Sequence, residues 1–77
     1  MGCQPTDGIG SVEITVNGAA RRLPREQTLL DLLAELALDP ARVAIEMDRR
    51  IVKRDEWGTL RPAAGSRIEI VQFVGGG

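Results

Sequence analysis

Residues 12–16 alternate between apolar and polar side chains, which is the period of two expected of a half-buried strand. Asn17-Gly18 follows, and both residue types tolerate the positive φ angles of a tight hairpin turn. Residues 19–23 then form the returning strand. Pro24 ends it, because proline has no backbone N–H to donate to a ladder. The chain is therefore predicted to open with a β-hairpin.

A helix is predicted after the hairpin. Thr28 is a suitable N-cap, and Asp31 stands three positions later, as in a capping box. Leucines then recur at helical spacing and place an apolar stripe on one side of the helix: Leu29, Leu32, Leu33 and Leu36. Asp39 precedes Pro40, and a residue before proline avoids the α region, so we expect the helix to end by about Leu38.

The second half of the chain predicts three more strands. Residues 43–47 alternate again, residues 48–50 form a turn, and Ile51-Val52 makes a short strand. A polar loop with a helical turn leads to the last strand, residues 67–73, which has Ile68 and Ile70 on one face. The order β-β-α-β-β-β is that of the α+β class, a mixed sheet with one crossing helix. This is the order of the β-grasp (ubiquitin-like) fold, in which the last strand pairs in the middle, beside the first.

Composition narrows the possible functions of the 77 residues, which are enough for one domain. The formal net charge of −1 argues against general nucleic-acid binding, and no apolar run approaches the length of a membrane span. The chain has no His, and its single Cys is Cys3, so we expect neither catalytic side chains nor a metal site. No disulfide framework and no signal peptide are visible, which favours the cytoplasm.

The segment before the hairpin, residues 1–11, is expected to be a flexible extension, native or left from cloning. Gly2 to Thr6 fits the loose N-myristoylation pattern, and Cys3 could be acylated beside it. The competing interpretation, which we favour, is that so short a pattern arises by chance. The expected organisation is thus an extension over residues 1–11, a domain over residues 12–74 and a tail over residues 75–77.

The three glycines at the end, Gly75, Gly76 and Gly77, are the strongest functional signal. Glycines cannot stabilise a fold by packing, and ordering them costs entropy. Without side chains they form a thin strand that can enter a narrow channel on another protein. The tail would deliver the α-carboxylate of Gly77 to a distant active site there.

A docking surface is predicted near this tail. If Ile68 and Ile70 face the helix, parity places Val71 and Phe73 on the opposite face, and Ala44 has the same parity on its own strand. Ala44, Val71 and Phe73 are therefore candidates for an apolar patch that meets a partner. The alternative is that the loop around Trp57 covers them. Trp57 itself is expected to pack this loop onto the edge of the sheet.

Basic residues gather around the turns of the chain. We expect them to form a solvated surface, and a secondary hypothesis is that some meet acidic surfaces of a partner. They are Arg21, Arg22, Arg49, Arg50, Lys53 and Arg54.

Three stretches of the second half resemble the ThiS family, the sulfur carriers of the thiamine pathway. Ile51-Val52-x-Arg54-x-x-Trp57 is similar to the family's IV-x-R-x-x-W element. Residues 65–70, GSRIEI, resemble its G-D-x-I-E-I element, and residues 73–77, FVGGG, resemble its ending. The resemblance covers about residues 12–77. Lys53 stands where the family often has Pro, and Ser66 where it often has Asp.

The resemblance implies a cycle in which this chain is a co-substrate and no catalyst. A ThiF-type adenylyltransferase would activate Gly77, using its own ATP and magnesium, and a cysteine desulfurase would supply sulfur. The sulfur would convert the activated carboxylate of Gly77 to a thiocarboxylate. This thiocarboxylate would then pass its sulfur to thiazole synthase (ThiG). The free chain is expected to be a monomer that binds no cofactor. Three alternatives stay open: a carrier for molybdopterin or another sulfur metabolite, a ubiquitin-like modifier, and a plain binding module.

Overall fold

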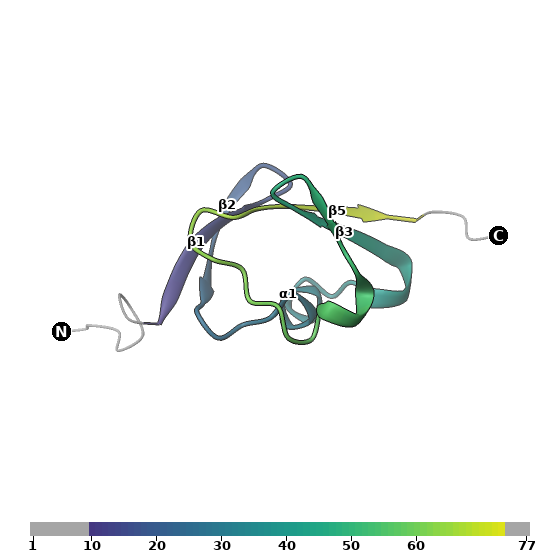
Figure 1. Cartoon of the computed structure of the whole chain (residues 1–77), viewed down its shortest axis with the longest axis horizontal. Coiled ribbons are helices and arrows are strands. Elements are labelled where there is room, and N and C mark those ends of the chain that lie inside the picture. Colours follow the sequence, from purple (N-terminus) through teal and green to yellow (C-terminus); the bar gives the residue numbers. More distant parts are fainter. Residues whose placement is uncertain (1–9, 74–77) are drawn as a thin grey trace.

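The computed structural model describes residues 10–73 and contains a five-stranded sheet with one α-helix packed on one face (Figure 1). Two short 3₁₀ helices, η1 and η2, lie before β3 and after β4. The elements follow one another as β1 (Ser11–Val16), β2 (Ala19–Pro24), α1 (Leu29–Glu35), η1 (Pro40–Arg42), β3 (Val43–Met47), β4 (Arg50–Val52), η2 (Arg54–Glu56) and β5 (Arg67–Gln72). This order confirms the predicted α+β architecture, and β1 begins at Ser11, one residue before the predicted start of the first strand at Val12.

The opening hairpin forms as predicted. β1 and β2 pair antiparallel, and the turn residues Asn17 and Gly18 have φ angles of 51° and 87°. β2 continues one residue further than predicted and includes Pro24, which lies opposite Ser11. β2 is an edge strand, and proline is tolerated there because its missing N–H can face away from the ladder.

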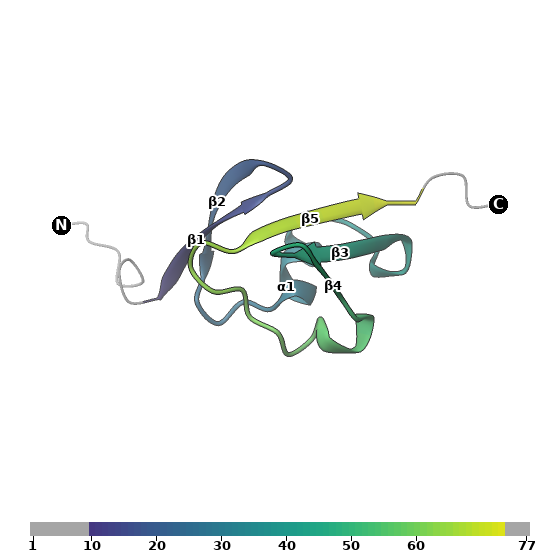
Figure 2. The same cartoon turned by 45° about the horizontal axis from the view of Figure 1, so that its top comes forward.

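The last strand lies at the centre of the sheet, as predicted. The strand order is β2-β1-β5-β3-β4, with β5 parallel to β1 and antiparallel to β3 (Figure 2). β5 ends at Gln72, one residue before the predicted end at Phe73. The N–H of Phe73 nevertheless donates to the carbonyl of Arg42 at 2.8 Å, so the chain follows β3 up to the last described residue.

The helix begins where its cap predicts and ends sooner than expected. The N–H of Asp31 donates to Thr28 Oγ1 at 3.2 Å, and the N–H of Thr28 donates to Asp31 Oδ2 at 3.1 Å, which completes the capping box. α1 ends at Glu35, whereas the sequence placed its limit near Leu38. The reason is Ala37, whose φ of 60° is left-handed and turns the chain out of the helix.

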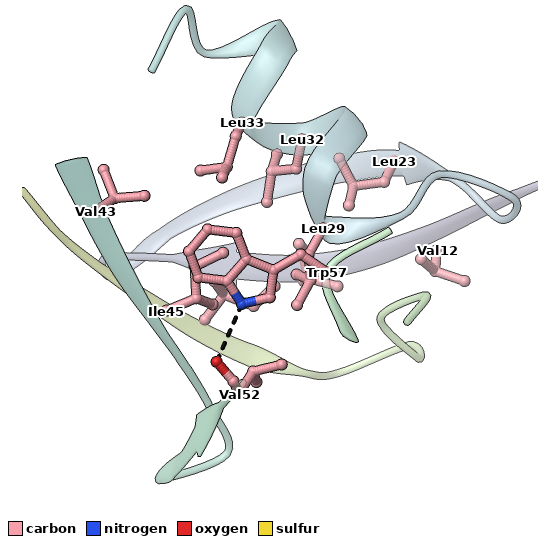
Figure 3. Packing of buried hydrophobic residues seen from close by; sticks show 11 residues of the cluster. Val12, Leu23, Leu29, Leu32, Leu33, Val43, Ile45, Val52 and Trp57 are labelled. Atoms are coloured by element: carbon pink, nitrogen blue, oxygen red, sulfur yellow. Dashed lines mark hydrogen bonds between the residues drawn. The ribbon is translucent and has the colours of Figure 1, made fainter. Parts of the chain in front are cut away.

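The core lies between α1 and the helix-facing side of the sheet (Figure 3). Leucines of α1 meet β-branched residues of the strands, and Trp57 closes the space between β4 and the helix. Residues of this cluster are buried almost completely: Val12, Ile14, Leu23, Leu29, Leu32, Leu33, Val43, Ile45, Val52, Trp57 and Ile68.

The loop after β4 is attached to both the helix and the sheet. The N–H of Leu29 donates to the carbonyl of Leu60 at 3.1 Å, and that of Leu30 donates to the carbonyl of Trp57 at 2.9 Å. These bonds satisfy N–H groups that the first turn of a helix leaves without intrahelical partners. The indole N–H of Trp57 donates to the carbonyl of Val52 at 3.0 Å, which confirms that Trp57 packs this loop against the sheet (Figure 3).

Candidate functional site

The end of β5 is the part of the described chain that lies nearest in sequence to the predicted functional group. Gly75, Gly76 and Gly77 lie outside the described residues, as does Cys3. β5 runs through the centre of the sheet and stops at Gln72, so four residues, 73–76, separate its last paired position from Gly77. The open face of the sheet near this end is therefore the candidate docking surface.

Two of the three predicted residues, Ala44 and Val71, come together on this open face, and Phe73 follows two residues after Val71. Ala44 and Val71 are directly opposite each other in the β3–β5 register. Val71 is 58% exposed and Phe73 is 51% exposed, whereas Ala44 is half-buried. The Trp57 loop lies on the helix side, where Trp57 is only 2% exposed, so it does not cover them.

The structure adds Ile51 to this face. Ile51 is 78% exposed, the largest exposure among the large apolar side chains of residues 10–73. Its register partner is Glu46, which lies two residues after Ala44 on β3 and therefore on the same face, and the same shallow groove is lined by Ala44, Glu46, Ile51 and Val71. Alternation in the short strand could have revealed it, because Val52 faces the core and its neighbour must then face outward.

Two acidic residues also line this groove. Glu46 and Glu69 are direct register partners on β3 and β5. Glu46 is half-buried and Glu69 is exposed. The register that places them side by side was not anticipated from the sequence, because it depends on how β3 and β5 align across a 19-residue separation between Met47 and Arg67 and not on either strand alone.

The Asn17 side chain extends the contact between β1 and β5 towards the tail. Asn17 Oδ1 accepts from the Ile70 N–H at 2.8 Å, and Asn17 Nδ2 donates to the Ile70 carbonyl at 3.3 Å. The side chain thus takes the place of a strand residue, because the β1–β5 ladder itself stops at Val16 and Ile68. Asn17 was predicted only as a turn residue, and this second role fixes β5 shortly before it ends.

The basic residues do not form one surface. Arg54 is structural: its guanidinium lies 4.9 Å from the centre of the Trp57 ring and donates to the carbonyls of Pro40 and Val43. Arg21 lies near Glu35 with an N–O distance of 3.9 Å, a contact that solvent weakens. The other four predicted residues are exposed: Arg22, Arg49, Arg50 and Lys53.

Within residues 10–73, the structure contains no group of three His, Cys, Asp or Glu side chains that could hold a metal ion. The same residues include no helix long and apolar enough to cross a membrane. What they present instead is an apolar groove with two carboxylates, beside the strand that leads to the glycines. Such an arrangement suits contact with another protein.

Comparison with known proteins points in one direction. The model of the ThiS family matches residues 14–77. Among solved structures, the fold is similar to the crystal structure of the thiamine biosynthesis protein ThiS from Geobacter metallireducens, with a TM-score of 0.72 and 23% sequence identity. That match covers 86% of this chain and all of the other.

Two curated relatives are longer proteins. The chain is 33% identical over 66 residues to a thiazole synthase of Paramagnetospirillum magneticum, and equally so to a thiazole synthase of Magnetococcus marinus. Each match covers 86% of this chain and 20% of the relative. The chain therefore spans about a fifth of the length of the curated relatives that it matches.

Proposed function

The chain belongs to the ThiS family of sulfur carriers in thiamine biosynthesis, and from this premise we propose that the carboxylate of Gly77 is its working group. A partner enzyme adenylates this carboxylate, and sulfur then converts it to a thiocarboxylate. The thiocarboxylate donates its sulfur for thiazole formation. The single observation that carries the proposal is the family match, which extends through the glycines to residue 77.

The chemistry needs an activated end, because a carboxylate is a poor electrophile. A carboxylate oxygen of Gly77 attacks the α-phosphorus of ATP, and pyrophosphate leaves. Hydrosulfide then attacks the acyl carbon, AMP leaves, a proton is released and the thiocarboxylate remains. If a protein persulfide attacks instead, an acyl disulfide forms first and a thiol must reduce it. The chain supplies no side chain to these steps and acts as a co-substrate.

The open face of the sheet is proposed as the surface that partners hold. Ala44, Val71 and Phe73 are assigned to it, and the exposure of Val71 and Phe73 supports this role because apolar and aromatic side chains in a patch favour association with another protein. The patch and the tail are joined by β5. An enzyme seated on the patch would therefore receive the tail in a defined direction.

The proposed partners follow from the cycle. A ThiF-type adenylyltransferase binds ATP and magnesium and activates Gly77, and a cysteine desulfurase supplies the sulfur. Thiazole synthase (ThiG) accepts it. The last assignment is supported by the curated relatives, since proteins named thiazole synthase contain a segment similar to this chain. The free carrier is proposed to be a cytoplasmic monomer that carries no cofactor of its own.

One experiment separates this function from its alternatives. The chain is incubated with ATP, a ThiF-type enzyme and a sulfur donor, and its intact mass is measured. Replacement of one oxygen by sulfur supports a carrier, whereas a series of heavier conjugates supports a ubiquitin-like modifier. An unchanged mass supports a plain binding module. As a control, a chain with one residue added after Gly77 should not gain sulfur.

A further inference from the structure

The groove on the open face, called the β3–β5 groove below, is more than an apolar surface. Apolar and acidic residues from three neighbouring strands line it: Ala44, Ile45, Glu46, Ile51, Glu69 and Val71. Figure 2 shows β4, β3 and β5 side by side, and β5 ends at Gln72, next to the last described residue. Apolar side chains therefore lie around two carboxylates, one of them on the strand that leads to the tail.

The two carboxylates lack cationic partners in the described chain. Within residues 10–73, no hydrogen bond or ion pair involves the side chain of Glu46 or Glu69. Arg67 lies two residues before Glu69, and Lys53 follows β4, yet neither forms an ion pair with the two acids. Like charges placed directly opposite each other across two strands destabilise a sheet. The pair is thus unfavourable in the isolated chain.

The other half of the same face is arranged differently. Glu13 on β1 lies opposite Arg22 on β2, so acid and base face each other in that register. Thr15 lies opposite Ala20, with no charge conflict. The sheet can therefore place opposite charges across from each other, and the β3–β5 groove is the place where it does not.

Resting on the proposed function, we propose that the β3–β5 groove receives an apolar surface of the adenylating enzyme that carries an Arg or Lys side chain between Glu46 and Glu69. This cation would relieve the repulsion between the carboxylates, while Ile51 and Val71 would bury apolar area. A partner without the cation would leave two carboxylates partly desolvated and unpaired. The acid pair would therefore select the partner as well as attract it.

The adenylating enzyme is the occupant that the geometry favours. β5 lies along the groove and continues into the tail, so a protein on the groove is also positioned to receive the terminal carboxylate. That enzyme must bind the chain before any sulfur is attached. At that stage the tail offers only glycines without side chains and the terminal carboxylate, so we expect the body of the carrier to supply most of the affinity.

The test uses matched charge changes on one face of the sheet. Glu69→Gln removes one member of the acid pair, and Glu69→Lys replaces it with a cation opposite Glu46. Glu13→Gln is the control, because it removes a carboxylate from the same face in the half where Arg22 already lies opposite it. For each chain, the urea midpoint of unfolding and the dissociation constant with the ThiF-type enzyme are measured at two salt concentrations.

We expect both Glu69 variants to unfold at a higher urea midpoint than the unmodified chain and yet to bind the enzyme more weakly. The loss should be about tenfold for Glu69→Gln and larger for Glu69→Lys, and the salt dependence of binding should decrease. Glu13→Gln should lower or leave unchanged the midpoint and should leave the dissociation constant unchanged. If Glu69 had a purely structural role, its replacement would not raise the stability of the chain and weaken its binding to the enzyme at the same time.

Three results would overturn the inference. Unchanged affinity of both Glu69 variants for the adenylating enzyme would show that no cation meets the pair. Weakened binding to thiazole synthase alone would assign the groove to another occupant, and loss of a carrier dimer in the variants would assign it to a second copy. The proposed function fails separately, namely if the unmodified chain gains no sulfur with this enzyme at saturating concentration.

Discussion

The two faces of the sheet carry similar residues in different surroundings. On the helix side, Val43, Ile45 and Ile68 are buried almost completely, whereas on the open side Val71 and Phe73 keep about half of their surface exposed. Both sets follow the same alternation of side chains along β3, β5 and the residue after β5. The difference arises because a single α-helix, α1, packs on the sheet within residues 10–73 and covers only one of its faces. No element of residues 10–73 covers the apolar residues on the open face, so they are available for contact with a partner.

The largest expected effect comes from placing the same charge on each face. Val43→Asp buries a carboxylate without a partner and should unfold the protein, with a loss of about 4 kcal/mol or more. Val71→Asp lies on the open face and should cost about 1 kcal/mol or less, while strongly reducing binding to the adenylating enzyme. Circular dichroism against urea and a binding titration measure the two effects. Unfolding of the Val71 variant would show that Val71 belongs to the core.

The two aromatic residues allow the next comparison, since the chain has one Trp and one Phe. Trp57→Ala removes a buried ring and its bond to Val52, and should lower the free energy of unfolding by about 3–5 kcal/mol. Phe73→Ala should change it by less than about 1 kcal/mol but weaken enzyme binding by about tenfold or more. Urea unfolding measures the stability of each variant, and titration measures its binding to the enzyme. Equal losses of stability in the two variants would contradict the division between the two faces.

A smaller effect is expected where the hairpin turn meets β5. Asn17→Gly keeps the positive φ of the turn but loses both bonds to the Ile70 backbone, which should cost about 1–2 kcal/mol. The amide of Ile70 should also exchange with solvent faster, and hydrogen exchange measures this directly. Protection of Ile70 that is unchanged in the variant would mean that the side chain is not what fixes this part of β5.

The smallest expected effect is a gain. Ala37 adopts a left-handed conformation at the end of α1, and glycine adopts it without the steric cost of a Cβ. Ala37→Gly should therefore raise the free energy of unfolding by about 0.5–1 kcal/mol and leave enzyme binding unchanged, because Ala37 is on the helix side. Thermal denaturation would reveal the gain, and a decrease in stability would show that strain at Ala37 is relieved in some other way.

Much of the fold could be predicted from local patterns in the sequence. Thr28 and Asp31 marked the start of the helix, Asn17-Gly18 marked the hairpin, and parity placed Val71 on the face opposite Ile68. Each of these depends on residues close together in the chain. The end of α1 was missed because alanine carries no signal for the left-handed conformation that Ala37 adopts.

The candidate site could be predicted only in part. The cross-strand pair of Glu46 and Glu69 depends on the register between two strands that are far apart in the sequence. The hydrogen bonds of the Asn17 side chain to the Ile70 backbone depend on where the β1–β5 ladder stops. The IV-x-R-x-x-W element is a third case. It suggested a pathway by resemblance, while its Arg54 and Trp57 stabilise the loop after β4 by stacking and hydrogen bonds.

The central claim is that the chain delivers sulfur from its own terminal acyl group. The most direct test loads the chain with isotopically heavy sulfur through the ThiF-type enzyme and then adds thiazole synthase with its small-molecule substrates. We expect the heavy sulfur to leave the chain and to appear in the thiazole. Heavy sulfur that stays on the chain while a thiazole with ordinary sulfur forms would contradict it.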